Sequence, residues 1–209
     1  LGPSHNQAIT TFQSSIDACV LWGETNGMFF HKAQALVFSP HGSTSPNLVP
    51  SNLSRLSFRN QPLPLNQSQP IRLLGVILDQ HLTMKNHIDH VLSRATPRLN
   101  ALRSISGHSW GADRSSLLRL YTAWIRPIIE YASPAYATAP KSALKKLDSL
   151  QNDAVRVILG TSRSSSIISS HAILRLQTLG LRRLQAAANL FADLNRSDPR
   201  DACTATWHS

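Results

Sequence analysis

The chain has 209 residues, and 42% of them are apolar, so it can fill one large core or two small ones and is not a disordered tail. Its 21 Lys and Arg residues outnumber its 11 Asp and Glu residues, and the net charge of +10 predicts a polyanionic partner, with nucleic acid first and an anionic membrane surface second. No apolar run reaches the roughly 18 residues of a membrane-spanning helix, and Cys19 and Cys203 lack the spacing of a zinc site or a disulfide framework.

The positive charge is concentrated in the second part of the chain. Residues 1–84 hold four basic and three acidic residues, whereas residues 85–160 hold 11 basic and five acidic ones. Residues 161–209 add six basic and three acidic residues. We therefore expect any surface for a phosphate backbone to lie after residue 84, although solvated helix faces would give the same pattern.

The first 80 residues predict one helix followed by short antiparallel strands and hairpins. Ile9, Phe12, Ile16 and Val20 recur at helical spacing, and Asn26-Gly27 is a natural stop. A loop rich in Ser, Pro and Asn lies before residue 55. The helix is expected over 6–25, and the strand candidates are 28–31, 34–38, 55–59, 62–65 and 71–78.

After Asp79 the pattern becomes helical. Pro97 and Pro127 should each bend a helix, and Asp113 is a good N-cap. Two apolar faces are expected to be buried, the first made by Ile88, Val91, Leu92, Ala95, Leu99 and Leu102, the second by Leu117, Tyr121, Trp124, Ile125, Ile128 and Ile129.

A third helix should open at Pro140-Lys141 and stop at Gly160, with Leu144, Leu147, Ala154 and Ile158 facing inward. A Ser-rich connector is expected over 161–170, one or two helices over 171–195, and a loose tail beyond. The fold class predicted from the sequence is α+β, with strands and a helix in front and an all-α part behind.

Five sequence blocks in this order resemble the reverse transcriptases of non-LTR (LINE-type) retrotransposons. The first is Trp22, Asn26-Gly27, Lys32 and Leu36-Val37-Phe38-Ser39, and the second is Leu73-Leu74-Gly75-Val76-Ile77-Leu78-Asp79 with Leu82-Thr83 and His87-Ile88. The others are Ser109-Trp110-Gly111, then Leu120-Tyr121 with Ile125-Arg126-Pro127-Ile128-Ile129-Glu130-Tyr131-Ala132, and finally Leu147-Asp148, Leu150-Gln151-Asn152, Val155-Arg156 and Ile158-Leu159-Gly160.

The resemblance covers roughly residues 8–190 and implies part of a right-handed polymerase that copies RNA into DNA. Residues 1–84 would be the C-terminal part of a truncated palm, and residues 85–209 the helical thumb and post-thumb region. The chain begins with Leu1 rather than Met, so we expect the fingers and the first palm strands upstream. The implied partner is an RNA template or an RNA–DNA hybrid, and the implied location is the cytoplasm, the nucleus or both.

The carboxylates that such an enzyme needs are not recognisable in this chain. Two Mg²⁺ ions are held by closely placed carboxylates during nucleotide transfer, and the family supplies an Asp-Asp pair that this sequence lacks. Asp17, Glu24 and Asp79 do not resemble a metal cluster. We therefore expect no cofactor in this chain, Mg²⁺ only in the full-length polymerase, and no polymerisation by the chain alone.

Two candidate functional positions follow from the resemblance. Lys32 stands where the family has a lysine that neutralises the departing pyrophosphate, although Ala33 replaces the usual Thr or Ser; a solvated turn lysine is an equal alternative. Leu73, Leu74 and Gly75 match the primer-grip hairpin, in which glycine lets the backbone approach the primer. Leu73 replaces the usual aromatic, and a buried strand glycine is the alternative.

The helical part offers two pairs of basic residues at a spacing of four, Arg94 with Arg98 and Lys141 with Lys145. Each pair shares a helix face and could follow a nucleic-acid backbone, and ordinary solvation is the alternative. Trp110, Tyr121 and Trp124 could stack on bases, but the spacing favours Tyr121 and Trp124 as core residues. The histidines lack partners at ligand spacing, so no metal site is assigned.

Two further hypotheses remain beside a reverse-transcriptase fragment. The basic helices could form a nucleic-acid-binding module without enzymatic activity. An Asp-Asp loop in the upstream coding sequence would argue against this hypothesis. The chain could also be a decayed element fragment, which predicts poor stability because half a palm exposes strand edges and apolar surface.

Overall fold

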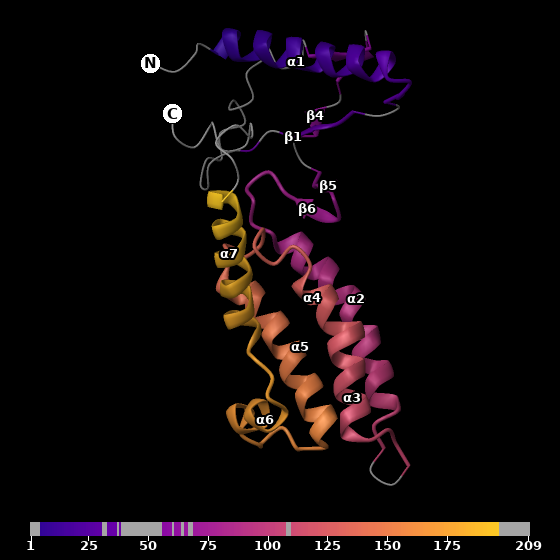
Figure 1. Ribbon diagram of the computed structural model, residues 1–209, viewed down its shortest axis with the longest axis vertical. Helices are drawn as coiled ribbons and strands as arrows, with labels where there is room; N and C mark the ends of the chain where they lie inside the picture. Colours follow the sequence, from indigo (N-terminus) through magenta and orange to yellow (C-terminus); the bar gives the residue numbers. More distant parts are fainter. Residues whose placement is uncertain are drawn as a thin grey trace. The chain divides into compact units, whose positions relative to one another are not determined.

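The computed structural model describes residues 5–30, 33–36, 38, 56–59, 61–63, 65–66, 69–107 and 110–196. The chain forms two compact units, Leu1–Thr83 and Met84–Ser209. In the described residues the first unit combines one long helix with short strands, and the second is helical (Figure 1). The fold class is therefore α+β, as the sequence predicts. Lys32 lies outside the described residues, as does the tail beyond residue 196.

The first unit begins with helix α1 (His5–Thr25), one residue longer than the predicted helix. Gly27, just beyond the helix, has a φ of 70°, in the left-handed region that favours glycine at a helix end. Gln13 joins the helix to the next segment, because its amide donates to the Ser57 carbonyl (3.1 Å) and accepts from the Ser57 N–H (2.9 Å). This pair of hydrogen bonds fixes the register between α1 and the strand that contains Ser57.

Short strands make up the rest of the described first unit. They form a parallel pair, β1 with β4, and two antiparallel pairs, β2 with β3 and β5 with β6. Each strand has only two or three residues, shorter than the sequence predicts. The bounds are β1 Ala35–Leu36, β2 Ser57–Phe58, β3 Gln61–Pro62, β4 Leu65–Asn66, β5 Ile71–Leu73 and β6 Val76–Leu78.

Two strand predictions need correction. Residues 28–30 are not a strand, because the Met28 N–H bonds to the Gly23 carbonyl (2.7 Å) and the segment closes the end of α1 instead. The apolar run over 71–78 is not one strand but a hairpin, as its resemblance to the primer-grip hairpin implies, because Leu74 and Gly75 both have positive φ, 46° and 85°, and turn the chain back.

The second unit is a set of packed helices. Helix α2 contacts α5 and the continuous helical segment made of α3, η3 and α4, while α7 lies along α5 and α4, and α6 lies against α5 (Figure 1). The η3 part is a π-helical turn. The bounds are α2 Lys85–Ser104, α3 Arg114–Leu120, η3 Tyr121–Ile125, α4 Arg126–Glu130, α5 Lys141–Leu159, α6 Ile167–Leu174 and α7 Leu179–Arg196.

The predicted helix ends in this unit are confirmed at two places. The Asp113 carboxylate accepts from the Ser115 and Ser116 N–H groups and caps α3. Hydrogen bonds from the Ser115 and Ser116 side chains, with smaller contributions from these N–H groups, lower the pKa of Asp113. Gly160 ends α5 with a φ of 64°. The Ser-rich connector is shorter than predicted, because the Ser166 hydroxyl accepts from the Ser169 N–H and α6 begins at Ile167.

The core of the second unit lies between α2, α5 and the α3–η3–α4 segment. The α2 residues predicted to face inward are buried except for half-buried Leu92, and α2 runs on through Pro97. In α5, Leu144 is half-buried and the other predicted inward positions are buried. Fully or nearly fully buried side chains include Ile88, Leu99, Leu102, Tyr121, Ile125, Ile129, Leu147, Ala154, Val155 and Ile158.

The π-turn η3 corrects one predicted core residue, Trp124. The buried positions of this segment are Leu117, Tyr121, Ile125 and Ile129, spaced four apart. In an α-helix such a spacing drifts around the axis, because each turn holds about 3.6 residues. The wider π-turn counters this drift, so these four residues stay on one face. Trp124 consequently faces outward and is 45% exposed.

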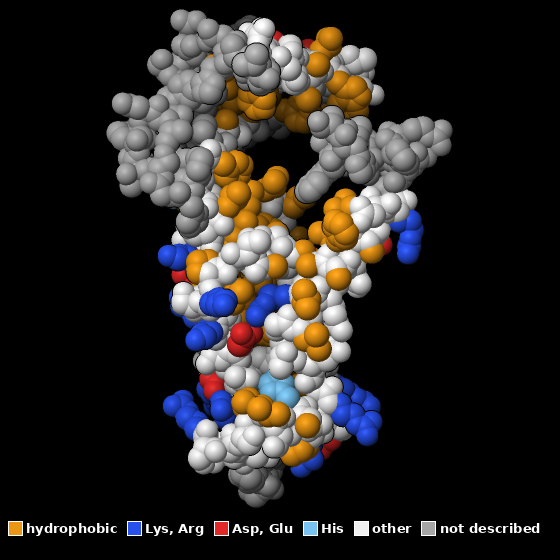
Figure 2. All heavy atoms as spheres, turned by 90° about the vertical axis from the view of Figure 1, so that its left-hand side faces the viewer, with side chains coloured by type: hydrophobic (Ala, Val, Ile, Leu, Met, Phe, Trp, Pro, Cys, Tyr) orange, Lys and Arg blue, Asp and Glu red, His pale blue; other side chains and the backbone are white. Residues whose placement is uncertain are grey.

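Helix α7 carries a row of exposed apolar side chains, and orange side chains of this kind are visible on the face shown in Figure 2. They are Leu181, Leu184, Leu190, Phe191 and Leu194. Among the described helices, none is long and apolar enough to cross a membrane.

Replacing Gly160 by Ala should lower the free energy of unfolding by about 1 kcal/mol, because a Cβ strains the left-handed backbone. Gly180→Ala is the matched control: Gly180 is helical, and an added Cβ would lie 3.8 Å from the nearest atom, an Arg183 nitrogen. That variant should be unchanged or slightly more stable. Urea unfolding followed by circular dichroism measures both, and equal effects at the two positions would contradict the cap at Gly160.

Candidate nucleic-acid interface

The predicted primer-grip residues lie at the tip of the β5–β6 hairpin. Leu73 pairs with Val76 at the end of the ladder, and Leu74 and Gly75 form the two-residue turn. Leu73 is 58% exposed and Leu74 is 84% exposed. The alternative of a buried strand glycine is therefore wrong, because Gly75 lies in a turn. The role of the tip in holding a primer stays a prediction.

Arg94 and Arg98 lie one turn apart on α2 and do share a face. An Arg98 guanidinium nitrogen donates to the Arg94 carbonyl (3.3 Å), and the guanidinium carbon lies 5.5 Å from the centre of the Trp124 ring. Arg94 is exposed and Arg98 is half-buried. In the described part of the chain neither residue forms an ion pair with a carboxylate.

Lys141 and Lys145 lie in the first turns of α5, and both are exposed. No carboxylate of the described residues pairs with either of them, whereas the neighbouring Lys146 binds Asp89 of α2 (2.8 Å). Arg126, Arg156, Arg182 and Arg183 of this unit also pair with carboxylates, and on the face shown in Figure 2 blue and red side chains are adjacent at several places.

Arg98 lies on the side of α2 away from Lys146. Asp89 lies on the side of α2 that reaches Lys146 of α5, and Arg98 on the side that reaches Trp124. These two α2 residues are nine positions apart, about two and a half helical turns, which places them on opposite sides of α2.

The other residues considered from the sequence differ in their exposure. Trp110 is 75% exposed beside Gly107. Tyr121 is fully buried, and burial raises the pKa of its hydroxyl. His87 is buried, and burial, with a smaller effect from the nearby His90, lowers its pKa. The described residues include no group of three His, Cys, Asp or Glu side chains that could hold a metal ion.

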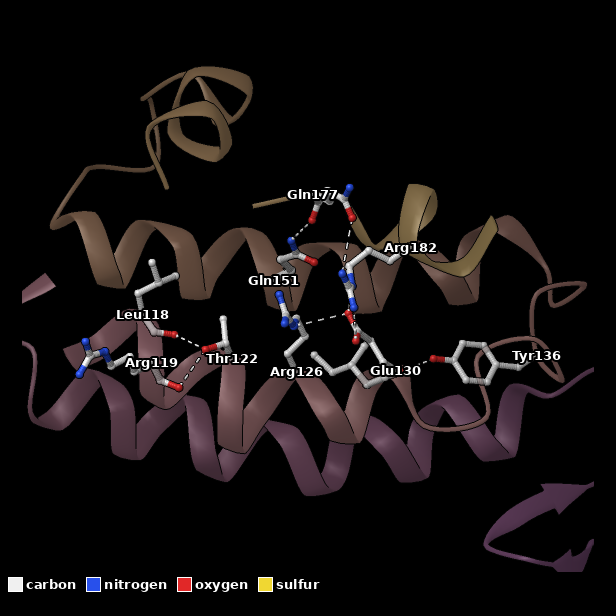
Figure 3. Close-up of polar contacts among 10 residues, drawn as sticks. Leu118, Arg119, Thr122, Arg126, Glu130, Tyr136, Gln151, Gln177 and Arg182 are labelled. Carbon is white, nitrogen blue, oxygen red and sulfur yellow. Dashed lines mark hydrogen bonds and ion pairs between the residues drawn. The ribbon is translucent and has the colours of Figure 1, made fainter. Parts of the chain in front are cut away.

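A charged cluster that the sequence did not reveal joins α4 to α7. Both Glu130 oxygens accept hydrogen bonds from Arg182, one of them from Nη2 at 2.9 Å, and Arg126 Nε lies 3.6 Å from Glu130 Oε1 (Figure 3). The side chains of all three residues are about one quarter to one third exposed. The bond to Glu130 raises the pKa of Arg182. One carboxylate thus holds two guanidinium groups.

A second set of bonds ties α5 to the segment between α6 and α7. The buried Gln151 amide donates to the Gln177 carbonyl (2.9 Å), and Gln177 Oε1 lies 3.5 Å from Arg182 Nη1 (Figure 3). Asp148 binds Arg183 (3.1 Å), while Asn152 Oδ1 lies 3.0 Å from His171 Nε2. These contacts fix α6 and α7 against α5.

The sequence contained a signal for these contacts. Arg126 and Glu130 belong to the fourth block of the resemblance, and Asp148, Gln151 and Asn152 belong to the fifth. None of them had a role assigned, because their partners lie up to 52 residues away in the sequence. Buried Tyr136, outside these blocks, donates its hydroxyl hydrogen to the Ile129 carbonyl, and burial raises its pKa to about 12.

The chain is 25% identical to the "Probable RNA-directed DNA polymerase from transposon X-element" of Drosophila melanogaster, over an alignment of 170 residues. The chain is similar to a transposon reverse transcriptase. The alignment covers 69% of this chain and 18% of that protein, so the chain spans less than a fifth of the length of its relative. No family profile and no solved structure matches the chain.

Glu130→Gln should lower the free energy of unfolding by about 1 to 3 kcal/mol, because Arg126 and Arg182 lose the carboxylate between them. Asp89→Asn is the matched control, since it removes the same charge from a pair whose side chains are 56% and 58% exposed. That change should cost less than about 0.5 kcal/mol. Urea titrations measure the difference, and equal losses would show that the Glu130 cluster adds no particular stability.

Proposed function

We propose that the chain is the C-terminal palm and thumb portion of the RNA-directed DNA polymerase of a non-LTR retrotransposon. Residues 1–84 are assigned to the palm and residues 85–209 to the thumb and post-thumb region. In this proposal the helical unit contacts the backbone of the RNA–DNA hybrid. The similarity to the transposon polymerase carries the proposal.

The distribution of unpaired charge supports the nucleic-acid partner. Six ion pairs use basic residues of the described chain, five of them in the helical unit. Arg94, Arg98, Lys141 and Lys145 stand outside these pairs. Because an unpaired cation on a helix surface can neutralise a phosphate and release counterions, these residues are the candidate backbone contacts.

We propose that this chain does not carry out nucleotide transfer by itself. Asp17 binds the Gln13 amide (2.8 Å), Glu24 lies 3.6 Å from Arg59, and an Asp79 oxygen accepts from the Thr83 N–H (3.0 Å). Each carboxylate thus has its own separate contact, and the set does not fit a site for two Mg²⁺ ions. Mg²⁺ binding and the transfer step are assigned to the full-length polymerase.

Two smaller assignments belong to the same proposal. The exposed tip Leu73-Leu74-Gly75 is the candidate primer grip, and Lys32 is the candidate for the pyrophosphate-side lysine. The location that follows from an enzyme acting on RNA and chromosomal DNA is the cytoplasm, the nucleus or both.

A second candidate function is a nucleic-acid-binding module without enzymatic activity. The observation in its favour is that the helical unit has a buried core of its own and carries all four candidate contacts on its surface. Sequencing the source transcript upstream of this chain separates the two functions, because only a polymerase requires an Asp-Asp loop there. A cooperative melting transition of the chain would count against a decayed fragment.

The purified 209-residue chain should not incorporate nucleotides on a primed RNA template with Mg²⁺. The expected cause is the lack of a carboxylate cluster able to hold the two metal ions. Primer extension on a sequencing gel measures this, with an active reverse transcriptase as the positive control. Template-dependent extension that persists after repeated purification would contradict the proposal that the chain does not carry out nucleotide transfer by itself.

The chain should bind a labelled RNA–DNA hybrid with an affinity that falls steeply as salt is added, because phosphate contacts release counterions. Lys141→Ala and Lys145→Ala should each reduce the slope of log affinity against log salt by about one. Lys146→Ala is the control: it changes the net charge equally, but its ammonium is already paired with Asp89. No binding at low salt by a folded chain would overturn the nucleic-acid partner.

A further inference from the structure

Trp124 is exposed in a segment that also contributes fully buried side chains to the core. The π-turn holds Tyr121 and Ile125 in the core, at 0% exposure, and leaves Trp124 45% exposed. Leu120, the residue before the π-turn, is 37% exposed. An exposed indole with a nearby apolar side chain is costly in water, and such aromatic residues are common where a protein contacts a partner.

Arg98 is held in place by two contacts of different kinds. Its guanidinium lies over the Trp124 ring at 5.5 Å, and one of its nitrogens donates to the Arg94 carbonyl at 3.3 Å. The guanidinium can therefore offer its remaining N–H groups to a ligand while it lies over the indole ring. Because the side chain is already ordered, a ligand that binds this edge pays less conformational entropy.

Arg94 adds a second positive charge one turn away. Like charges at this spacing repel each other along a helix, and here no carboxylate of the described residues compensates them. By contrast, Arg126 and Arg182 share the carboxylate of Glu130. An anion bound between Arg94 and Arg98 would remove the repulsion in the same way.

We propose that Arg94, Arg98 and Trp124 form a binding site for one phosphodiester group of a nucleic-acid duplex, with the Trp124 ring against the adjoining sugar. This inference rests on the proposed function and names one of its contact sites. Two N–H groups of a guanidinium match two phosphate oxygens, which a lysine cannot do. The exposed indole and Leu120 suit the apolar edge of a sugar. An acidic protein side chain would bring a carboxylate but no such sugar edge.

Arg98→Lys tests the site, because it keeps the charge and removes the flat fork that rests on Trp124. In fluorescence-anisotropy titrations with a labelled RNA–DNA hybrid, this variant should bind about fivefold to tenfold more weakly, with the salt slope almost unchanged. Arg98→Ala should weaken binding further and reduce the slope by about one. Trp124→Ala should weaken binding about fivefold with an unchanged slope.

Two matched controls separate this site from a general loss of charge or aromatic surface. Arg103→Lys changes an exposed arginine of the same helix, whose described partner is Asn100 rather than an aromatic ring, and should bind like the parent chain. Trp110→Phe alters the 75% exposed tryptophan outside the site and should also have no effect. Circular dichroism melting of each variant identifies any loss of folding. If Trp124→Ala does not fold, the binding of Arg98→Lys alone tests the site.

The outcomes distinguish this inference from the proposed function. If the parent chain does not bind the hybrid at low salt, the proposed function itself fails. If it binds, and Arg98→Lys binds equally well, the phosphodiester site is wrong while the proposed function stands. Polyglutamate of matched charge serves as a competitor. If it displaces the labelled hybrid as effectively as unlabelled hybrid does, the site does not recognise a phosphodiester.

Discussion

Pro127 imposes the constraint on which the arrangement of the helical unit depends. Because proline has no N–H, the helix that contains it loses a hydrogen bond one turn earlier. The chain accommodates this with the π-turn Tyr121–Ile125, in which the Arg126 N–H bonds to the Tyr121 carbonyl. The wider turn keeps Tyr121, Ile125 and Ile129 on the buried face. It thereby turns Trp124 outward under Arg98.

The basic residues of the helical unit divide into two groups with different consequences. Arg182 and Arg183 bind carboxylates of α4 and α5 and so fix α7 against these helices, while Arg126 binds Glu130 within α4. The cations without carboxylate partners include Arg94, Arg98, Lys141 and Lys145. A net charge alone cannot separate these groups, since both contribute equally to +10. Only the contacts show which charges a polyanion could neutralise.

Local signals in the sequence were sufficient for the long helices and their ends. The apolar spacing located α1, α2 and α5, and Asp113 and Gly160 marked a beginning and an end, because caps depend on neighbouring residues only. The periodicity over 71–78 showed only one continuous apolar run, and the hairpin turn at Leu74-Gly75 was indicated by the resemblance instead. Trp124 was wrongly placed in the core, because helical spacing assumes α geometry and η3 departs from it.

The candidate site was predictable only in part, for a related reason. The spacing of four showed that Arg94 and Arg98 share a face, since this follows from helix geometry alone. Their contact with Trp124 is a tertiary contact between α2 and η3, which no local pattern encodes. The same holds for Glu130 with Arg182, and for Gln151 with Gln177. The motif blocks contained one partner of each of these last two pairs, Glu130 and Gln151, and the fold supplied the other.

Photochemical crosslinking of the purified chain to an RNA–DNA hybrid, followed by mass spectrometry of the linked peptides, tests whether the helical unit contacts nucleic acid. We expect crosslinks in the peptides that contain Arg94–Arg98, Trp124 and Lys141–Lys145, and we expect these crosslinks to be lost at high salt. Crosslinks confined to the Ser-rich connector over 161–166, or equally strong crosslinking at high salt, would contradict a nucleic-acid interface on α2, η3 and α5.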